Sequence, residues 1–166
     1  MLAPVSHPSL GKPPRSLQAG FPDGAARLRA NQAALAARAL EVAVDVDPTI
    51  RSRYDEPALR NLLRDAEVFV ERLALCVAAD DPYFLEHFAD QTATIFRRRK
   101  VGMDDVTKLL EGLRAAARGI LSPAEVAAAD RGIDAGVAVF EWYRQIAGDA
   151  RKKNPILQAL YKGIGS

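Results

Sequence analysis

Cysteine and histidine are scarce in this sequence. The chain has one cysteine, Cys76, and two histidines among 166 residues, so it can form no internal disulfide, and no Cys/His set has the spacing of a zinc site. A glycine-rich phosphate loop and a Ser/His/Asp grouping are missing as well. Glu86 directly precedes His87, which is not the Glu-x-x-His spacing of di-iron helical bundles. The sequence therefore predicts neither a metal site nor enzymatic activity.

Aromatic residues and net charge are also low. Aromatic residues make up 7% of the chain, whereas 49% is hydrophobic and mainly alanine and leucine, which favours closely packed helices over a β-sandwich. The 23 basic and 21 acidic residues give a formal charge of +2, too small to indicate a nucleic-acid or membrane-surface binder. The sequence shows neither the roughly 18 consecutive apolar residues of a membrane span nor a signal-peptide core. We therefore expect a cytoplasmic protein without membrane association.

Proline and glycine are concentrated near the N-terminus. Four prolines and two glycines fall within the first twenty residues, and this segment has no apolar periodicity, so it cannot bury enough apolar surface to offset chain entropy. We expect residues 1–22 to form a disordered, proline-rich arm. Residues 23–166 have the length of one domain and are predicted to form a single all-α domain, either globin-like or an antiparallel bundle.

Helix start signals, together with apolar residues at three- to four-residue spacing, predict five main helices and a short sixth. Asp23 is a candidate cap for the first helix and Asp55 for the second, while Ser122-Pro123-Ala124-Glu125 has the pattern of a capping box for the fifth. The residues expected on the inward face of the third helix are Phe84, Leu85, Phe88, Thr92, Ile95 and Phe96. The predicted ranges are 23–44, 55–80, 82–100, 103–120, 123–150 and 156–162.

Three glycines lie inside predicted helices, where glycine costs about 1 kcal/mol relative to alanine. They are Gly112 in the fourth helix and Gly132 and Gly136 in the fifth. A neighbouring helix at a small interaxial distance is the simplest reason for such positions, and an adjacent ligand pocket is the alternative. We therefore predict close helix crossings at these glycines.

The strongest charge run is Arg97-Arg98-Arg99-Lys100, in the last turn of the third predicted helix. Cations at this position complement the negative end of the helix dipole, so the run can be a solvated helix end. It can also bind phosphate or an acidic partner. A small nucleic-acid-binding helical protein stays open as an alternative function, although no aromatic residue interrupts the run.

Large apolar side chains gather near the C-terminus. Trp142 and Tyr143 are followed, after a basic segment, by Leu157, Leu160 and Tyr161. Such side chains at helical spacing either complete the core or dock on a second copy of the chain, because aromatic residues are frequent interface anchors. We predict that the protein forms a homodimer through this region.

Cys76 and His87 are the candidate cofactor ligands. His87 is the only histidine of the predicted domain, which raises the question of haem ligation, but no second ligand accompanies it. Cys76 lies in an apolar stretch, which favours a small buried hydrophobe, and the nearby Asp80 and Asp81 disfavour a thiolate. The prediction is a protein without a cofactor, with a haem or bilin bound at one of these residues as the alternative.

Residues 96–106, FRRRKVGMDDV, and residues 109–114, LLEGLR, resemble the N-terminal sensory domain of RsbR-type stressosome proteins. The similarity is of pattern and covers about residues 27–147. It implies a globin-like fold without haem and a non-enzymatic, dimeric signalling module of bacteria, whose output passes to a C-terminal STAS domain. About twenty residues follow the fifth predicted helix, too few for such a domain. A signalling role therefore calls for a separate partner protein, unless the chain is a freestanding relative with a different task.

Phycobiliproteins are a second family that this sequence resembles. In that family a cysteine and a nearby aspartate engage a linear tetrapyrrole, and Cys76, Asp80 and Tyr83 are similar to that pattern. The arginine and aspartate that should closely follow the cysteine are replaced by residues 77–79, which are apolar. Taken together, these observations predict a globin-like sensor or protein-interaction module in bacterial signalling or stress response. A tetrapyrrole-binding globin relative is the alternative function.

Overall fold

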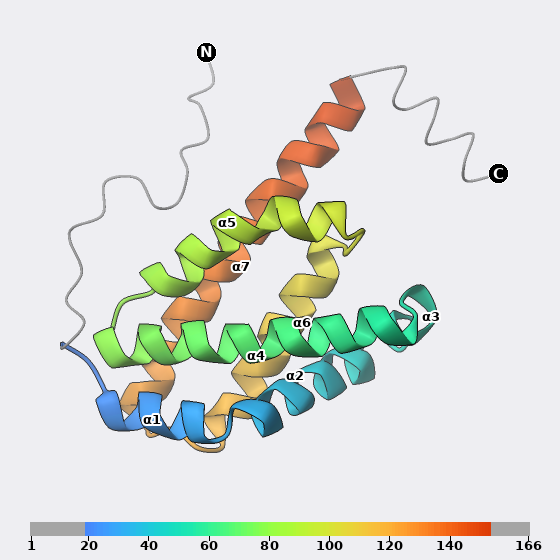
Figure 1. The fold of residues 1–166 in the computed structure, drawn as a ribbon. Coiled ribbons are helices and arrows are strands. Elements are labelled where there is room, and N and C mark those ends of the chain that lie inside the picture. The colour runs from blue at the N-terminus through green and yellow to red at the C-terminus, as the bar shows by residue number, and fades with distance from the viewer. Residues whose placement is uncertain (1–18, 154–166) are drawn as a thin grey trace, which may run out of the picture.

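Helix α4 (Glu56–Ala79) lies at the centre of the fold, and every other long helix packs against it (Figure 1). The computed structural model describes residues 19–153, and within that range all regular structure is α-helical, with no strand. This confirms the predicted all-α fold class. The remaining helices are α1 (Pro22–Ala30), α2 (Gln32–Val46), α3 (Ile50–Arg53), α5 (Tyr83–Arg98), α6 (Met103–Arg118) and α7 (Pro123–Lys153).

Phe69, on α4, lies in the middle of the core. Its side chain is fully buried, and its ring lies 5.7 Å from Phe88 and 6.2 Å from Phe96 on α5, and 6.3 Å from Phe140 on α7, measured between centroids. Helix α4 begins as predicted, because the Asp55 carboxylate accepts a hydrogen bond of 2.9 Å from a first-turn amide. Burial of these rings holds α5 and α7 against α4.

The single helix predicted over 23–44 is wrong, because the structure has two helices, α1 and α2, that meet at Asn31. Asn31 leaves helical geometry, with φ −113° and ψ 19°, and its side-chain amide donates to the carbonyl of Arg27 at 2.8 Å. Asparagine interrupts helices in this way by competing for backbone hydrogen bonds. The predicted cap is also wrong, since Phe21 occupies the cap position and Asp23 lies in the first turn.

The inward face of α5 differs from the prediction at Ile95. This side chain is 46% exposed, and Thr92 is only half-buried. Ala89 and Ala93 are fully buried instead, while Ile95 falls on another side of the helix. The buried residues of α5 are Leu85, Glu86, Ala89, Ala93 and Phe96.

The close helix crossing predicted at Gly112 is confirmed, and Gly132 also has a tight neighbour, but Gly136 does not. A Cβ atom on Gly112 would lie 2.2 Å from the carbonyl oxygen of Ala39, where α6 crosses α2. A Cβ atom on Gly132 would lie 3.1 Å from the Sγ atom of Cys76, and one on Gly136 would have an ordinary contact of 3.5 Å. The α2–α6 crossing therefore depends on the missing side chain at residue 112.

The capping box predicted at the start of α7 is confirmed. The Ser122 N–H donates to Glu125 Oε1 at 2.9 Å, and the Glu125 N–H donates to Ser122 Oγ at 3.4 Å. Arg27 of α1 also binds the Glu125 carboxylate, at 2.8 Å. Burial opposes ionisation of Glu125, but these hydrogen bonds and the ion pair hold its pKa below the usual value. This carboxylate therefore joins α1 to the beginning of α7.

The predicted N-terminal arm and the predicted short C-terminal helix lie partly or wholly outside the described residues. Gly20 and Phe21, at the end of the predicted arm, donate backbone hydrogen bonds of 3.1 and 2.9 Å to the last turn of α4. Residues 1–18 and the short helix predicted over 156–162 are outside the described residues. Among the helices of residues 19–153, none combines the length and the apolar character needed to cross a lipid bilayer.

Candidate functional site

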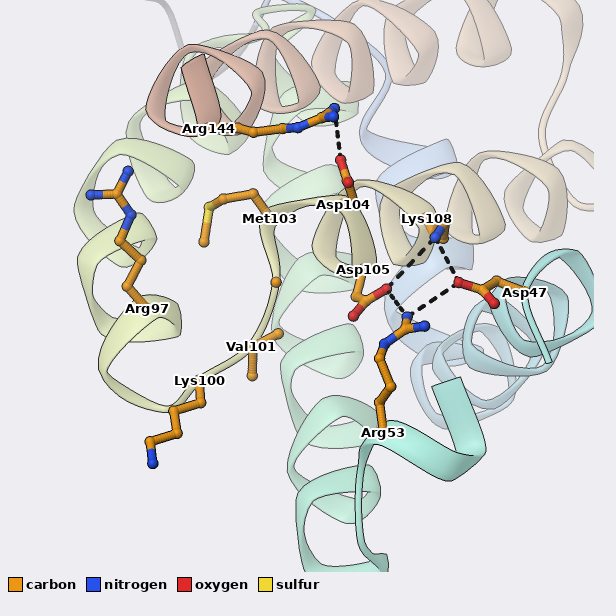
Figure 2. Close-up of a pocket in the computed structure, with 11 residues that line it drawn as sticks. Asp47, Arg53, Arg97, Lys100, Val101, Met103, Asp104, Asp105, Lys108 and Arg144 are labelled. Carbon is orange, nitrogen blue, oxygen red and sulfur yellow. Dashed lines mark hydrogen bonds and ion pairs between the residues drawn. The ribbon is translucent and has the colours of Figure 1, made fainter. Parts of the chain in front are cut away.

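A cleft of about 680 Å³ lies where the turn between α5 and α6 meets α3 and α7 (Figure 2). Its lining contains five basic and three acidic side chains, which leaves an excess of two positive charges. The basic residues are Arg53, Arg97, Lys100, Lys108 and Arg144, and the acidic residues are Asp47, Asp104 and Asp105. The cleft is therefore a charged surface built from three separate stretches of the chain: residues 47–53, 97–108 and Arg144.

Asp47 holds one side of the cleft together. Its carboxylate follows the end of α2 and accepts hydrogen bonds from the Thr49 N–H at 3.1 Å and the Thr49 hydroxyl at 2.5 Å, which shape the turn into α3. The same carboxylate pairs with Lys108 at 2.8 Å and with Arg53 at 3.1 Å. The bond from Lys108, followed by that from Thr49, holds the pKa of Asp47 well below its usual range. Asp47 is thus ionised and fixed in place at neutral pH.

Asp105 is the buried carboxylate of the cleft, with an exposed fraction of 7%. It accepts hydrogen bonds of 2.5 Å from both the Tyr54 hydroxyl and the Arg53 guanidinium, and the Gly102 N–H donates to the Tyr54 oxygen at 3.1 Å. Burial, followed by the bond to Asp105, raises the pKa of Tyr54, so this hydroxyl stays a donor at neutral pH. These bonds attach the first turn of α6 to α3. We call Asp47, Arg53, Asp105 and Lys108 the paired wall.

The opposite side of the cleft, the open wall, consists of Arg97 and Lys100. Arg97 donates to the backbone carbonyl of Tyr143, and its guanidinium lies 5.8 Å from the centre of that ring. Lys100 follows the end of α5 with a positive φ of 60°, and the next amide closes the helix end with a bond of 2.9 Å to Phe96. Within the described residues neither cation forms an ion pair. Figure 2 shows both across the cleft from the paired wall, with the Lys100 stem extended away from it.

Arg144 connects the cleft to the part of α7 that leaves the helical bundle. It pairs with Asp104 at 2.9 Å, and both side chains are more than half exposed. Phe140 is the last buried residue among the described side chains of α7, and Ile146, six residues later, is 43% exposed. Figure 1 shows α7 continuing well past its neighbours from this point. The cleft therefore lies at the base of a projecting helix.

No protein-family model, curated protein or solved structure matches this chain. The resemblances to RsbR-type sensory domains and to phycobiliproteins therefore remain predictions. What the cleft does has to follow from its own geometry and from its position beside α7.

The structure divides the predicted charge run among different neighbours. Arg97 and Lys100 line the cleft, as a binding role requires. Arg99 instead makes two hydrogen bonds of 3.0 and 2.7 Å to Asp65 on α4, which raise its pKa and make it a structural contact. Arg98 is exposed and does not line the cleft.

The structure describes two of the residues predicted to bind a partner near the C-terminus. Trp142 and Tyr143 are half-buried at the base of the projecting helix, with ring centroids 4.9 Å apart. Leu157, Leu160 and Tyr161 lie outside the described residues. A homodimer formed through this region stays a prediction.

The paired wall could not be predicted from the sequence. Asp47 and Lys108 are 61 residues apart, and Arg53 and Asp105 are 52 apart, so no local pattern relates them. Asp47 directly precedes Pro48, and an Asp-Pro pair by itself indicates only a turn. Correlated substitution of these four charges among related sequences is the signal that would identify them.

The candidate cofactor ligands, Cys76 and His87, are not among the residues that line the cleft. His87 is half-buried and stacks on Tyr83, with ring centroids 5.0 Å apart. Cys76 is fully buried, its Sγ accepts a backbone N–H at 3.4 Å, and burial raises its pKa to about 12. Asp80, the aspartate of the phycobiliprotein resemblance, pairs with Arg131. Within residues 19–153 no cluster of three or more His, Cys, Asp or Glu side chains could hold a metal ion.

We expect the Cys76 thiol of the native protein to react with a disulfide reagent on the order of 100-fold more slowly than in the urea-unfolded chain at pH 8. The thiol is buried, and its raised pKa keeps it neutral while the unfolded thiol begins to ionise near its ordinary pKa. Folding stability should therefore fall as the pH rises above about 9. Stopped-flow labelling measures the rate, and rapid labelling of the folded chain would return Cys76 to consideration as a ligand attachment site.

Proposed function

We propose that this chain is a non-enzymatic, globin-like sensor or protein-interaction module of bacterial regulation, which works as a homodimer and acts on a separate partner protein. One observation carries the proposal: the charged cleft and the projecting part of α7 share their contacts. Arg97 holds the backbone of Tyr143, and Asp104 holds Arg144, at the base of that projection. The charged cleft and a helix that extends beyond the core are thus adjacent in the fold.

This arrangement can couple binding to the position of the helix. The Arg144–Asp104 pair is solvent-exposed, and such pairs contribute about 0 to 1 kcal/mol, so a ligand that competes for either charge can replace it at little cost. Replacing it alters the contacts at the base of α7. A sensor requires a ligand that binds with different affinities when the Arg144–Asp104 pair is formed and when it is broken, because only such a ligand shifts the helix.

The chemistry of the cleft favours recognition over catalysis. Asp47 has a pKa far below its usual value, because Lys108 and Thr49 bond to its charged form, which makes it a poor general base at neutral pH. Asp105 is occupied by Tyr54 and Arg53. The centre of the core is filled by phenylalanine rings, which supports a surface site over a tetrapyrrole held inside the fold.

Light scattering of the purified full chain tests the dimer, and Ile146 tests its location. We expect the mass of a dimer at a chain concentration of about 100 µM. Ile146→Asp should raise the dissociation constant of the dimer about tenfold, because pairing would bury the new carboxylate on the projecting helix. Val46→Asp is the matched control, since Val46 is 70% exposed at the end of α2. A strict monomer would remove the homodimer from the proposal, and equal weakening by both variants would remove the role of α7.

A further inference from the structure

We propose that the cleft binds a small polyanion, a molecule that carries two or more phosphate or carboxylate groups. The inference rests on the proposed function, because it names the class of ligand that the module would sense. It stands on the charge, shape and backbone geometry of the cleft, and each of these can be traced to particular residues.

The excess positive charge is concentrated on one side of the cleft. Each carboxylate of the lining has a cation of the lining as its partner: Asp47 and Asp105 are bound by Arg53 and Lys108, and Asp104 by Arg144. Arg97 and Lys100 are the cations left over, and both belong to the open wall. An anion between the walls would therefore meet charge that the described protein groups do not neutralise.

Lys100 occupies a backbone position that glycine ordinarily fills. Its φ of 60° lies in the left-handed region, where a side chain is strained, and the turn hydrogen bonds around it are those of a glycine-terminated helix. Backbone strain of this kind is frequent at binding sites, and here it occurs at a residue on the edge of the charged cleft. Its flexible stem lets the ammonium swing into the cleft, although it extends outward in Figure 2.

The first residues of α6 line the cleft, and the start of a helix carries backbone donors without an intrahelical partner. The cap residue of this 16-residue helix is Gly102, which has no side chain. It therefore makes no capping hydrogen bond to the first-turn amides of Met103 and Asp104. These amides carry the positive end of the helix dipole, which favours anions. The Asp105 carboxylate in the same turn is neutralised by Arg53 and buried, so it offsets this field only in part.

Asp104 is the one carboxylate that an incoming anion has to displace. Both partners of its pair with Arg144 are exposed, whereas Asp105 itself is buried in its pair with Arg53. An anion can therefore take Arg144 from Asp104 and bind it in the forked geometry that guanidinium groups offer to phosphate and carboxylate. The volume of about 680 Å³ is within the range of small-molecule sites.

The occupant is a small molecule rather than a nucleic acid. Three carboxylates line the same cleft, and the whole chain carries a formal charge of only +2. A polymer of phosphates needs an extended basic surface, because its affinity comes from many phosphate contacts. A compact anion needs only the few cations gathered here.

Titration of the full chain with pyrophosphate and, separately, with citrate tests the proposal. At low ionic strength we expect saturable binding of at least one probe below about 1 mM, with NMR shifts at the amides of Met103 and Asp104. Arg97→Gln and Lys100→Gln should each weaken binding about fivefold to tenfold, and Asp104→Asn should strengthen it severalfold. Arg98→Gln is the matched control, since it removes the same charge from the residue next to Arg97, outside the cleft, and it should change affinity less than twofold.

The pattern of outcomes separates the possibilities. Pyrophosphate alone identifies a phosphorylated ligand, citrate alone a polycarboxylate, and both together a site that selects by charge and size. Absence of saturable binding to either probe, or an equal loss in Arg98→Gln, would overturn the proposal. The Ile146→Asp variant should still bind the probes saturably, so a failed dimer and a failed anion site are told apart in the same set of samples.

Discussion

Replacing Gly112 with alanine is expected to lower the free energy of unfolding by about 3 kcal/mol. The new Cβ would lie 2.2 Å from the carbonyl oxygen and 3.0 Å from the carbonyl carbon of Ala39, which are backbone atoms and cannot rotate away. Helices α2 and α6 would have to separate, and the buried contacts along both would loosen. Alanine has a higher helix propensity than glycine, by about 1 kcal/mol. The destabilisation caused by the steric clash therefore has to exceed this gain for the variant to be less stable.

Urea denaturation followed by circular dichroism measures the effect, and Gly119→Ala provides the matched control. Gly119 ends α6 with helical angles, φ −70° and ψ −16°, and its nearest neighbour would be 3.8 Å from the new Cβ. We expect this control to gain up to about 1 kcal/mol by restricting the unfolded chain. Equal stability changes in the two variants would contradict the close backbone contact at Ala39.

The same crossing positions the paired wall of the cleft. Gly112 lies one helical turn after Lys108 on α6, and Ala39 lies about two turns before Asp47 on α2. The distance between the two helix axes therefore sets whether Lys108 can reach Asp47, which it does at 2.8 Å. A variant that widens this crossing should also disturb the cleft, so packing in the core and geometry at the surface are linked.

Features of the fold that depend on neighbours in the sequence could be predicted. The cap at Asp55 and the capping box at Ser122 and Glu125 each need only residues within one helical turn, and both occur as predicted. Gly112 inside a helix predicts a close neighbour, because close packing against another helix can offset the low helix propensity of glycine. What the glycine could not indicate was that Ala39 is that neighbour.

Features that depend on competition or on tertiary packing were predicted wrongly or missed. Asn31 breaks the first predicted helix, although the apolar spacing continues on both sides of it. The short helix α3 has four residues, too few for a periodic pattern to emerge. The apolar spacing predicts Ile95 in the core because it is large and apolar, whereas the smaller Ala89 and Ala93 are fully buried.

The candidate site illustrates the same limit. The run from Arg97 to Lys100 was visible as a cluster of charge, but its members serve separate purposes because successive helical positions point about 100° apart. Only the folded chain shows that Arg99 binds Asp65 while Arg97 and Lys100 face the cleft. The remaining cations come from α3, α6 and α7, and chain folding alone brings them together.

Removal of the Asp105 side chain is the second large effect that we expect. Asp105→Ala should lower the free energy of unfolding by about 2 to 3 kcal/mol, because the Tyr54 hydroxyl and the Arg53 guanidinium lose a shared, mostly buried acceptor. Arg53 is 42% exposed and can regain water, so the loss should stay below that of a fully buried pair. Chemical denaturation measures it, with an unchanged denaturant slope showing that the unfolded state is unaltered.

Asp104→Ala is the matched control for this prediction, because the two aspartates are adjacent in the first turn of α6 and differ in burial. The Asp104 pair is exposed on both sides, so its loss should cost only about 0.5 kcal/mol. If Asp105→Ala cost no more than this control, the bonds to Tyr54 and Arg53 would not hold α3 against α6. The two variants should differ because of access to water. At Asp104, water can take the place of the lost carboxylate as a hydrogen-bond partner, whereas the groups around the buried Asp105 are less accessible to water.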